Sequence, residues 1–104
     1  MNLFNLSKDI EAMVSMSNTE PHLTLYGRMN CPYCVRVYRF IDDLGLVDRI
    51  ENRKTTFGSK WRTDLKYRTG RTQVPCLFID GQPLFESLDI IEWFKANKEK
   101  LLMP

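Results

Sequence analysis

The feature that most constrains the fold is the segment 74–85, with the sequence VPCLFIDGQPLF. Its first half, residues 74–79, is an apolar run, which is typical of a strand that is buried on both faces of a sheet. Asp80-Gly81 is a strong two-residue hairpin signal, because this turn requires positive φ at both positions. Residues 82–85 are then predicted to return as an antiparallel strand. Such a strand needs helices over both faces of its sheet, so the segment predicts a layered α/β domain.

The spacing of apolar residues predicts the other elements. In chain order they are a strand over 22–27, a helix over 32–44 that Gly45 ends, a charge-interrupted strand over 47–53, a helix over 59–68, the hairpin, and a final helix with Ser87 as its N-cap. A helix between the first two strands favours parallel pairing, whereas the hairpin is antiparallel. We therefore expect a mixed four-stranded sheet flanked by helices.

A further helix is predicted ahead of this domain. Residues 3–16 carry apolar side chains at helical spacing, and small polar residues then lead to Pro21. The chain is thus predicted to consist of an N-terminal amphipathic helix and linker over 1–21 and one domain over 22–104.

Composition excludes several classes of function. The 104 residues suffice for one core. The net charge of +2 argues neither for nor against nucleic-acid binding, but the lack of a long basic run and of an RNA-binding signature argues against it. No apolar run approaches the roughly 20 residues of a membrane span, and Asp9 and Glu11 interrupt any signal-peptide core. Three cysteines without an export signal favour the reducing cytoplasm. We expect a monomer.

The chemistry is predicted to lie at Cys31-Pro32-Tyr33-Cys34, between the first strand and the next helix. Pro32 suits the first position of a helix. If Cys31 caps that helix, the two Cα atoms lie about 5–6 Å apart, which a disulfide can bridge. The helix dipole and Arg28 would both lower the pKa of Cys31. We therefore predict that Cys31 is the nucleophile and that Cys34, behind the ring of Tyr33, is the resolving thiol.

A zinc site is the competing interpretation of the cysteine pair. It requires four ligands, and the sequence has neither a second Cys-x-x-Cys nor a histidine pair. His22 and Cys76 are the other candidates, and their spacing does not group them with the pair. We predict no metal site, and we expect Cys76 to be a buried, unreactive thiol.

The sequence RMNCPYC at 28–34 resembles the dithiol active site of the glutaredoxins, and Val74-Pro75 matches a second signature of that family. The resemblance runs over about 22–98. It implies the thioredoxin fold, with Pro75 in a cis peptide bond beside the active-site cysteine. It also implies a glutathione-dependent thiol–disulfide oxidoreductase with glutathione as co-substrate, no tightly bound cofactor, and disulfide-containing or glutathionylated proteins as partners.

The resemblance further implies a glutathione site. The backbone of Val74 would pair with the cysteine of glutathione, next to Pro75. Ser87, Leu88 and Asp89 would hold the γ-glutamyl end, with backbone N–H groups for its carboxylate and the Asp for its amine, as a helix N-terminus allows. The remaining candidates are Tyr33 against the substrate, and Arg28, Arg62 or Arg71 for the glycine carboxylate.

Several alternatives remain open at this point. Ser87 and Asp89 could simply cap the final helix. Phe85-Glu86 replaces the usual Gly-Gly of glutaredoxins, and Phe-Glu-Ser resembles the N-terminal domain of glutathione transferases, which binds the same γ-glutamyl group. A transferase-like glutathione-binding module is therefore one alternative. An iron–sulfur cluster carrier is another, although such glutaredoxins mostly carry a single active-site cysteine.

Overall fold

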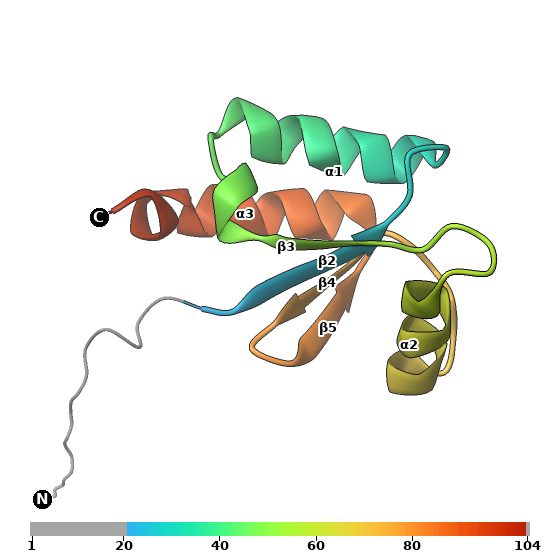
Figure 1. Ribbon diagram of the computed structural model, residues 1–104. Coiled ribbons are helices and arrows are strands. Elements are labelled where there is room, and N and C mark those ends of the chain that lie inside the picture. Colours follow the sequence, from blue (N-terminus) through green and yellow to red (C-terminus); the bar gives the residue numbers. More distant parts are fainter. Residues whose placement is uncertain (1–20, 104) are drawn as a thin grey trace, which may run out of the picture.

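The computed structural model describes residues 21–103, which form one mixed four-stranded sheet in the order β3-β2-β4-β5 with helices on both faces (Figure 1). The elements are β2 (Leu23–Gly27), α1 (Pro32–Asp43), the 3-10 turn η2 (Val47–Arg49), β3 (Glu51–Lys54), α2 (Lys60–Thr69), β4 (Cys76–Ile79), β5 (Gln82–Phe85) and α3 (Ser87–Leu102). The predicted mixed sheet flanked by helices is confirmed. The predicted N-terminal helix lies outside the described residues.

The strand β2 is the centre of the sheet and is buried along its whole length. It pairs in parallel with β3 and antiparallel with β4, so that Tyr26 lies opposite both Arg53 and Cys76. The strand β4 in turn pairs antiparallel with β5 across the predicted hairpin. Asp80 and Gly81 have φ values of 50° and 87°, which confirms the two-residue turn with positive φ at both positions.

The two faces of the sheet carry different layers. On one face α1 and α3 lie side by side (Figure 1), and the main core packs between them and the sheet. This core includes Val37 and Ile41 of α1 and Ile90 and Phe94 of α3, all buried. The other face carries a smaller cluster, in which Leu65 of α2 meets three side chains of the central strands: Tyr26, Cys76 and Phe78.

Polar contacts add to the apolar contacts of Leu65, the one buried residue of α2, in connecting this helix to the sheet. The hydroxyl of Tyr26, a residue only 1% exposed, donates a hydrogen bond to Asp64. Arg53 donates to that hydroxyl oxygen at 2.6 Å and to Asp64 at 3.2 Å, and its guanidinium stacks 4.3 Å from the ring centroid of Trp61. Residues 70–75 connect the end of α2 to β4.

Two local predictions were wrong. Residues 47–53 are not one strand, because Val47–Arg49 forms a 3-10 turn that brings the chain from α1 to the sheet edge before β3 begins. The charges of β3 are compatible with a strand because its side chains are mainly exposed on that edge. Ser87 is not the N-cap of the final helix either. It is the first helical residue, and Glu86 occupies the cap position.

None of the helices between residues 21 and 103 is both long enough and apolar enough to cross a membrane.

Candidate active site

The loop after β2 places Cys31 at the start of α1. Cys31 has extended backbone angles, φ −114° and ψ 115°, and occupies the N-cap position, and Pro32 begins the helix. Its Sγ accepts a hydrogen bond from the backbone N–H of Cys34 at 3.3 Å. The sulfur therefore takes the place that a Ser or Asp oxygen occupies at ordinary helix starts, at the positive end of the helix dipole.

The two thiols of this turn have opposite pKa shifts. For Cys31, burial raises the pKa, but the hydrogen bonds from the Cys34 thiol and from backbone N–H groups, together with the charge of Arg28, outweigh burial and lower it below its ordinary value. For Cys34, burial and the hydrogen bond to Cys31 raise the pKa to about 12. Of the two thiols, Cys31 therefore ionises more readily near neutral pH, whereas Cys34 keeps its proton.

The surroundings of Cys34 include a side chain that was not predicted. Tyr33 itself is 59% exposed, with the guanidinium of Arg36 5.8 Å from its ring centroid. Cys34 is fully buried, and the side chain that reaches its sulfur region is Tyr38, one turn later on α1. The i, i+4 spacing of Cys34 and Tyr38 is the sequence signal that identifies this neighbour.

A cavity of about 590 Å³ opens beside this turn. Apart from the three candidate arginines, its lining includes every residue predicted to bind glutathione: Tyr33, Val74, Pro75, Ser87, Leu88 and Asp89. The Val74-Pro75 peptide bond is cis, as predicted. Segments far apart in the sequence thus meet at one cavity, where the start of α1, the loop before β4 and the start of α3 converge.

The start of α3 is held differently from that of α1. Glu86 precedes the helix with φ 73° and ψ 118°, and its side chain makes no capping hydrogen bond. Its carbonyl accepts the N–H of Ile90 at 3.0 Å, so the helix is fully formed from its first turn. The backbone N–H groups of Ser87 and Leu88, at the cavity wall, are among the first-turn donors that a helix leaves without an intrahelical partner.

Two cavity residues, Arg36 and Gln73, were not predicted, and a third, Glu86, was predicted only as part of the transferase-like alternative. Gln73 donates from its amide to Glu86 at 3.1 Å and accepts from Arg71 at 3.0 Å, and the Arg71 guanidinium stacks 4.3 Å from the ring centroid of Phe85. The position of Arg36 one turn after Tyr33 and the position of Gln73 next to Val74 were the available sequence signals.

The candidate cations occupy different places. Arg36 lines the cavity and Arg71 lies beside it through Gln73. Arg28 acts on Cys31 instead, and Arg62 lies 5.7 Å from the ring centroid of the exposed Phe57. Arg36 and Arg71 are therefore the arginines found at or beside the cavity in which glutathione is predicted to bind.

The third thiol and the histidine lie apart from the pair. Cys76 is fully buried in β4, and burial raises its pKa to about 12. Over residues 21–103 there is no group of three or more His, Cys, Asp or Glu side chains placed to hold a metal ion.

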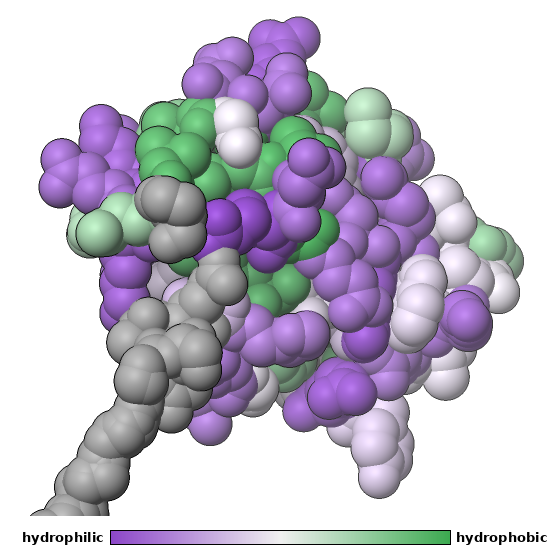
Figure 2. Space-filling model, turned by 60° about the vertical axis from the view of Figure 1, so that its left-hand side comes forward, coloured by the Kyte–Doolittle hydropathy of each residue, from purple (hydrophilic) through white to green (hydrophobic). Residues whose placement is uncertain are grey.

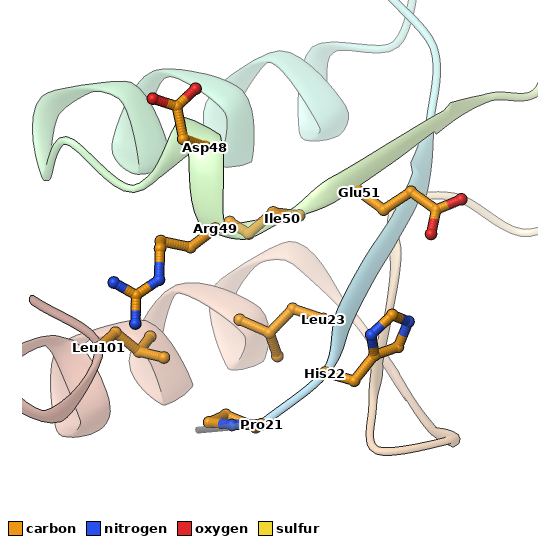
Figure 3. Close-up of a pocket in the computed structure, with 8 residues that line it drawn as sticks. All are labelled: Pro21, His22, Leu23, Asp48, Arg49, Ile50, Glu51 and Leu101. Carbon is orange, nitrogen blue, oxygen red and sulfur yellow. The ribbon is translucent and has the colours of Figure 1, made fainter. Parts of the chain in front are cut away.

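A second hollow, of about 540 Å³, lies at the opposite end of the sheet. Figure 3 shows its side chains between the start of β2, the η2–β3 segment and the end of α3. They include His22, Asp48, Arg49 and Glu51, but no thiol. Figure 2 looks toward this end of the molecule, where hydrophobic side chains gather among hydrophilic ones. The cavity beside α1, by contrast, is lined by Tyr33 of the turn that carries the thiol pair.

Residues 25–100 match the family model described as Glutathione S-transferase, N-terminal domain. Glutaredoxin-C6 of Oryza sativa subsp. japonica is 34% identical over 83 residues, which cover 79% of this chain and 71% of the relative. Glutaredoxin 1 of Escherichia coli (strain K12) is 27% identical over 84 residues, which cover 70% of this chain and 92% of the relative.

Solved structures of both kinds share the fold. Glutaredoxin C1 from Populus tremula x tremuloides, in its holo form, superposes with a TM-score of 0.56 at 25% identity, covering 77% of this chain and 81% of that one. The Tau class glutathione S-transferase of Mangifera indica gives a TM-score of 0.60 at 24% identity, covering 76% of this chain. This chain spans only 35% of that transferase. The common part is the sheet with its three helices, which confirms the predicted thioredoxin fold.

Proposed function

Since the chain belongs to the glutaredoxin family of the thioredoxin-fold superfamily, and is therefore a thiol–disulfide oxidoreductase, we propose that it reduces glutathione mixed disulfides and protein disulfides through the Cys31–Cys34 dithiol. The observation that carries this proposal is the opposite perturbation of two adjacent thiols. Cys31 ionises readily at the N-terminus of α1, while burial keeps Cys34 protonated. A nucleophile and a partner held in reserve are what a dithiol mechanism requires.

The first step is attack of the Cys31 thiolate on the glutathione sulfur of a mixed disulfide. A bond forms between Cys31 Sγ and that sulfur, the substrate disulfide breaks, and the substrate leaves as a thiolate that takes a proton from water. A second glutathione thiolate then attacks the bound glutathione, which yields glutathione disulfide and returns Cys31 to its ionised state.

Protein disulfides use the second thiol. After Cys31 has formed a mixed disulfide with the protein, Cys34 loses its proton and attacks Cys31 Sγ, so that the substrate is released and the internal disulfide forms. Two glutathione molecules then reduce that disulfide in turn. The high pKa of Cys34 supports this order, because an ionised Cys34 would compete with Cys31 for the first attack.

Glutathione is proposed to lie in the 590 Å³ cavity. Its cysteine would pair with the backbone of Val74, and its γ-glutamyl carboxylate would accept from the N–H groups at the start of α3. Asp89 would hold the α-amine. Arg36, which lines the cavity, is added here to the cations proposed for the glycine carboxylate. We further propose that the protein works in a reducing compartment such as the cytoplasm, where its three free thiols would persist.

A second candidate function is a transferase-like glutathione-binding module, favoured by Phe85-Glu86-Ser87 and by the family-model match. Glutathione conjugation to a chlorinated aromatic compound is the test. A rate clearly above the uncatalysed one would favour this candidate, and no acceleration would remove it.

The primary test is glutathione-coupled reduction of a small mixed disulfide and of a protein disulfide. We expect Cys31→Ser to abolish both activities, because the attacking sulfur is lost. Cys34→Ser should retain a substantial part of mixed-disulfide reduction and lose protein disulfide reduction. Cys76→Ala is the matched control, a cysteine substitution away from the reacting pair, and should keep both. Full activity of Cys31→Ser would contradict the proposal.

A further inference from the structure

Tyr38 carries a buried hydroxyl that the mechanism above does not use. The residue lies on α1 one turn after Cys34. Its ring is only partly buried, but the hydroxyl oxygen is inaccessible and has no hydrogen-bond partner among the described residues. A buried hydroxyl without a partner is uncommon, because it loses its hydrogen bonds to water and gains none in return. Such a group calls for an explanation in function or in a second state of the protein.

The hydroxyl borders the same small space as the sulfur of Cys34. A β-carbon placed on Gly27 would lie 2.5 Å from the Tyr38 oxygen and 3.2 Å from Cys34 Sγ. The absence of a side chain at Gly27 therefore lets both groups approach the end of β2. The Lys54 ammonium lies 5.3 Å from the ring centroid of Tyr38 and covers its ring.

Cys34 Sγ can still accept a hydrogen bond from the direction of the Tyr38 hydroxyl. In the reduced protein the Cys34 thiol gives its hydrogen bond to Cys31, as the lowered pKa of Cys31 reflects. The lone pairs of Cys34 Sγ are free of that bond. When Cys34 Sγ becomes a thiolate, it can only accept hydrogen bonds. Because Cys34 is fully buried, this thiolate needs hydrogen-bond donors from the surrounding protein.

We infer that the Tyr38 hydroxyl donates a hydrogen bond to Cys34 as this sulfur leaves the Cys31–Cys34 disulfide. This inference rests on the dithiol mechanism proposed above. In that step a thiolate attacks Cys31 Sγ, a new disulfide forms to Cys31, the Cys31–Cys34 bond breaks, and Cys34 departs with the electron pair. The departing thiolate then takes a proton from solvent, and Tyr38 keeps its own.

Two physical arguments support the role. Burial, followed by the charges of Cys34 and Cys31, raises the pKa of Tyr38 above its ordinary value, so the hydroxyl keeps the proton that it must share. The rate of thiol–disulfide exchange also rises as the pKa of the leaving thiol falls. A donor to the Cys34 thiolate lowers that pKa from the high value that burial imposes, and so speeds the departure of the sulfur.

The test measures reduction of the internal disulfide by dithiothreitol in oxidised wild-type protein and in Tyr38→Phe, which removes one oxygen atom. We expect the rate constant to fall about tenfold, the loss typical of a hydrogen bond to a charged group. Tyr67→Phe is the matched control, because Tyr67 is 89% exposed on α2, and it should react at the wild-type rate. An unchanged rate in Tyr38→Phe would overturn the inference.

A double-mutant comparison separates this role from a structural one. In Cys34→Ser protein, which works through Cys31 alone, adding Tyr38→Phe should leave the reduction of a mixed disulfide unchanged, because no Cys34 thiolate forms. An equal loss in the two backgrounds would show a general structural effect and overturn the inference.

Failure of the proposed function would look different. The assay for Tyr38 uses dithiothreitol in place of glutathione. The comparison of Tyr38→Phe with wild type therefore gives a result even if glutathione is not a substrate. A wild-type protein that is reduced by dithiothreitol but shows no glutathione-dependent turnover would contradict the proposed function alone.

Discussion

The helices α1 and α3 begin at the same end of the sheet and lie side by side on one face (Figure 1), yet their first turns are built differently. At α1 the cap is a sulfur of the chain itself, because Cys31 Sγ accepts the N–H of Cys34. At α3 the cap residue is Glu86, whose side chain makes no capping bond. The start of α1 thus holds a group of the chain itself that can become an anion, whereas the start of α3 is open to an anionic group of a ligand.

The difference shows how one electrostatic feature can serve both halves of a reaction site. The N-terminal charge of a helix stabilises any anion placed there, whether a thiolate or a ligand carboxylate. The distinction between α1 and α3 is the local side chain: Cys31 can supply an anion of its own, whereas Ser87, which lines the cavity and is 6% exposed, carries no charge. This contrast can be tested from both sides.

The largest expected effect is the selectivity of the three thiols. The pKa values of Cys34 and Cys76 are raised to about 12, and that of Cys31 is lowered below its ordinary value. At neutral pH the thiolate fraction of Cys31 should therefore be far larger than that of Cys34 or Cys76. Brief alkylation of the reduced protein with iodoacetamide, followed by mass spectrometry, should find the label on Cys31. Labelling of all three at similar rates would contradict the contrast between the thiols.

The next effect concerns the start of α3. Asp89→Asn removes the proposed partner of the γ-glutamyl amine, and we expect KM for a glutathione mixed disulfide to rise about tenfold with little change in kcat, as for one charged hydrogen bond. Glu99→Gln, which removes a carboxylate from the exposed side of the same helix, is the control. An unchanged KM in Asp89→Asn would show that this residue does not hold the ligand.

A smaller effect tests the charge beside α1. Arg28 contributes to the lowered pKa of Cys31, so Arg28→Gln should raise that pKa. At mildly acidic pH, Cys31 of the variant therefore carries less thiolate than Cys31 of the wild type and should be alkylated about two- to fourfold more slowly. At high pH, Cys31 is ionised in both proteins, so the two rates should converge. Arg39→Gln, further along α1, should follow the wild-type pH profile. A variant that is slower by the same factor at every pH would show that Arg28 does not act on ionisation.

The smallest expected effect is on stability at the cap of α3. Glu86 has a positive φ, which costs a non-glycine residue about 1–3 kcal/mol, whereas glycine loses about 0.5–1 kcal/mol through its freer unfolded chain. We therefore expect Glu86→Gly to raise the free energy of unfolding by about 1 kcal/mol in urea denaturation. Glu99→Gly, within the helix, should lower it by a similar amount. A destabilised Glu86→Gly would mean that the hydrogen bond from Gln73 to Glu86 outweighs the backbone strain.

Local rules sufficed for much of the fold. The hairpin at Asp80-Gly81 and the start of α1 at Pro32 depend on turn chemistry and spacing within a few residues, and the sequence displays both directly. The position of α2 could not be predicted in this way. It depends on Tyr26, Arg53 and Asp64, which lie on three separate elements and meet only after the sheet has formed.

The residues of the candidate site fall into the same two groups, those that the sequence predicts and those that only the tertiary fold brings together. Cys31 and its partner were predictable because one turn of helix contains them, and the cavity residues of α3 followed from the resemblance to glutaredoxins. Gln73 and Arg36 join the cavity through the tertiary fold, and their positions next to Val74 and one turn after Tyr33 were the only local signals for them. The cap at Glu86 was mistaken for Ser87 because nothing in a glutamate side chain signals a positive φ.

The ends of the described chain have a practical consequence. The start of β2 and the end of α3 lie together at the end of the sheet opposite the cavity, as Figure 1 shows. A linker placed after Leu102 would therefore leave the molecule on the side remote from its reactive sulfur. Attachment to an electrode or a resin through that point should orient every copy with Cys31 toward the solution, which makes this small domain suitable for immobilised electron-transfer devices.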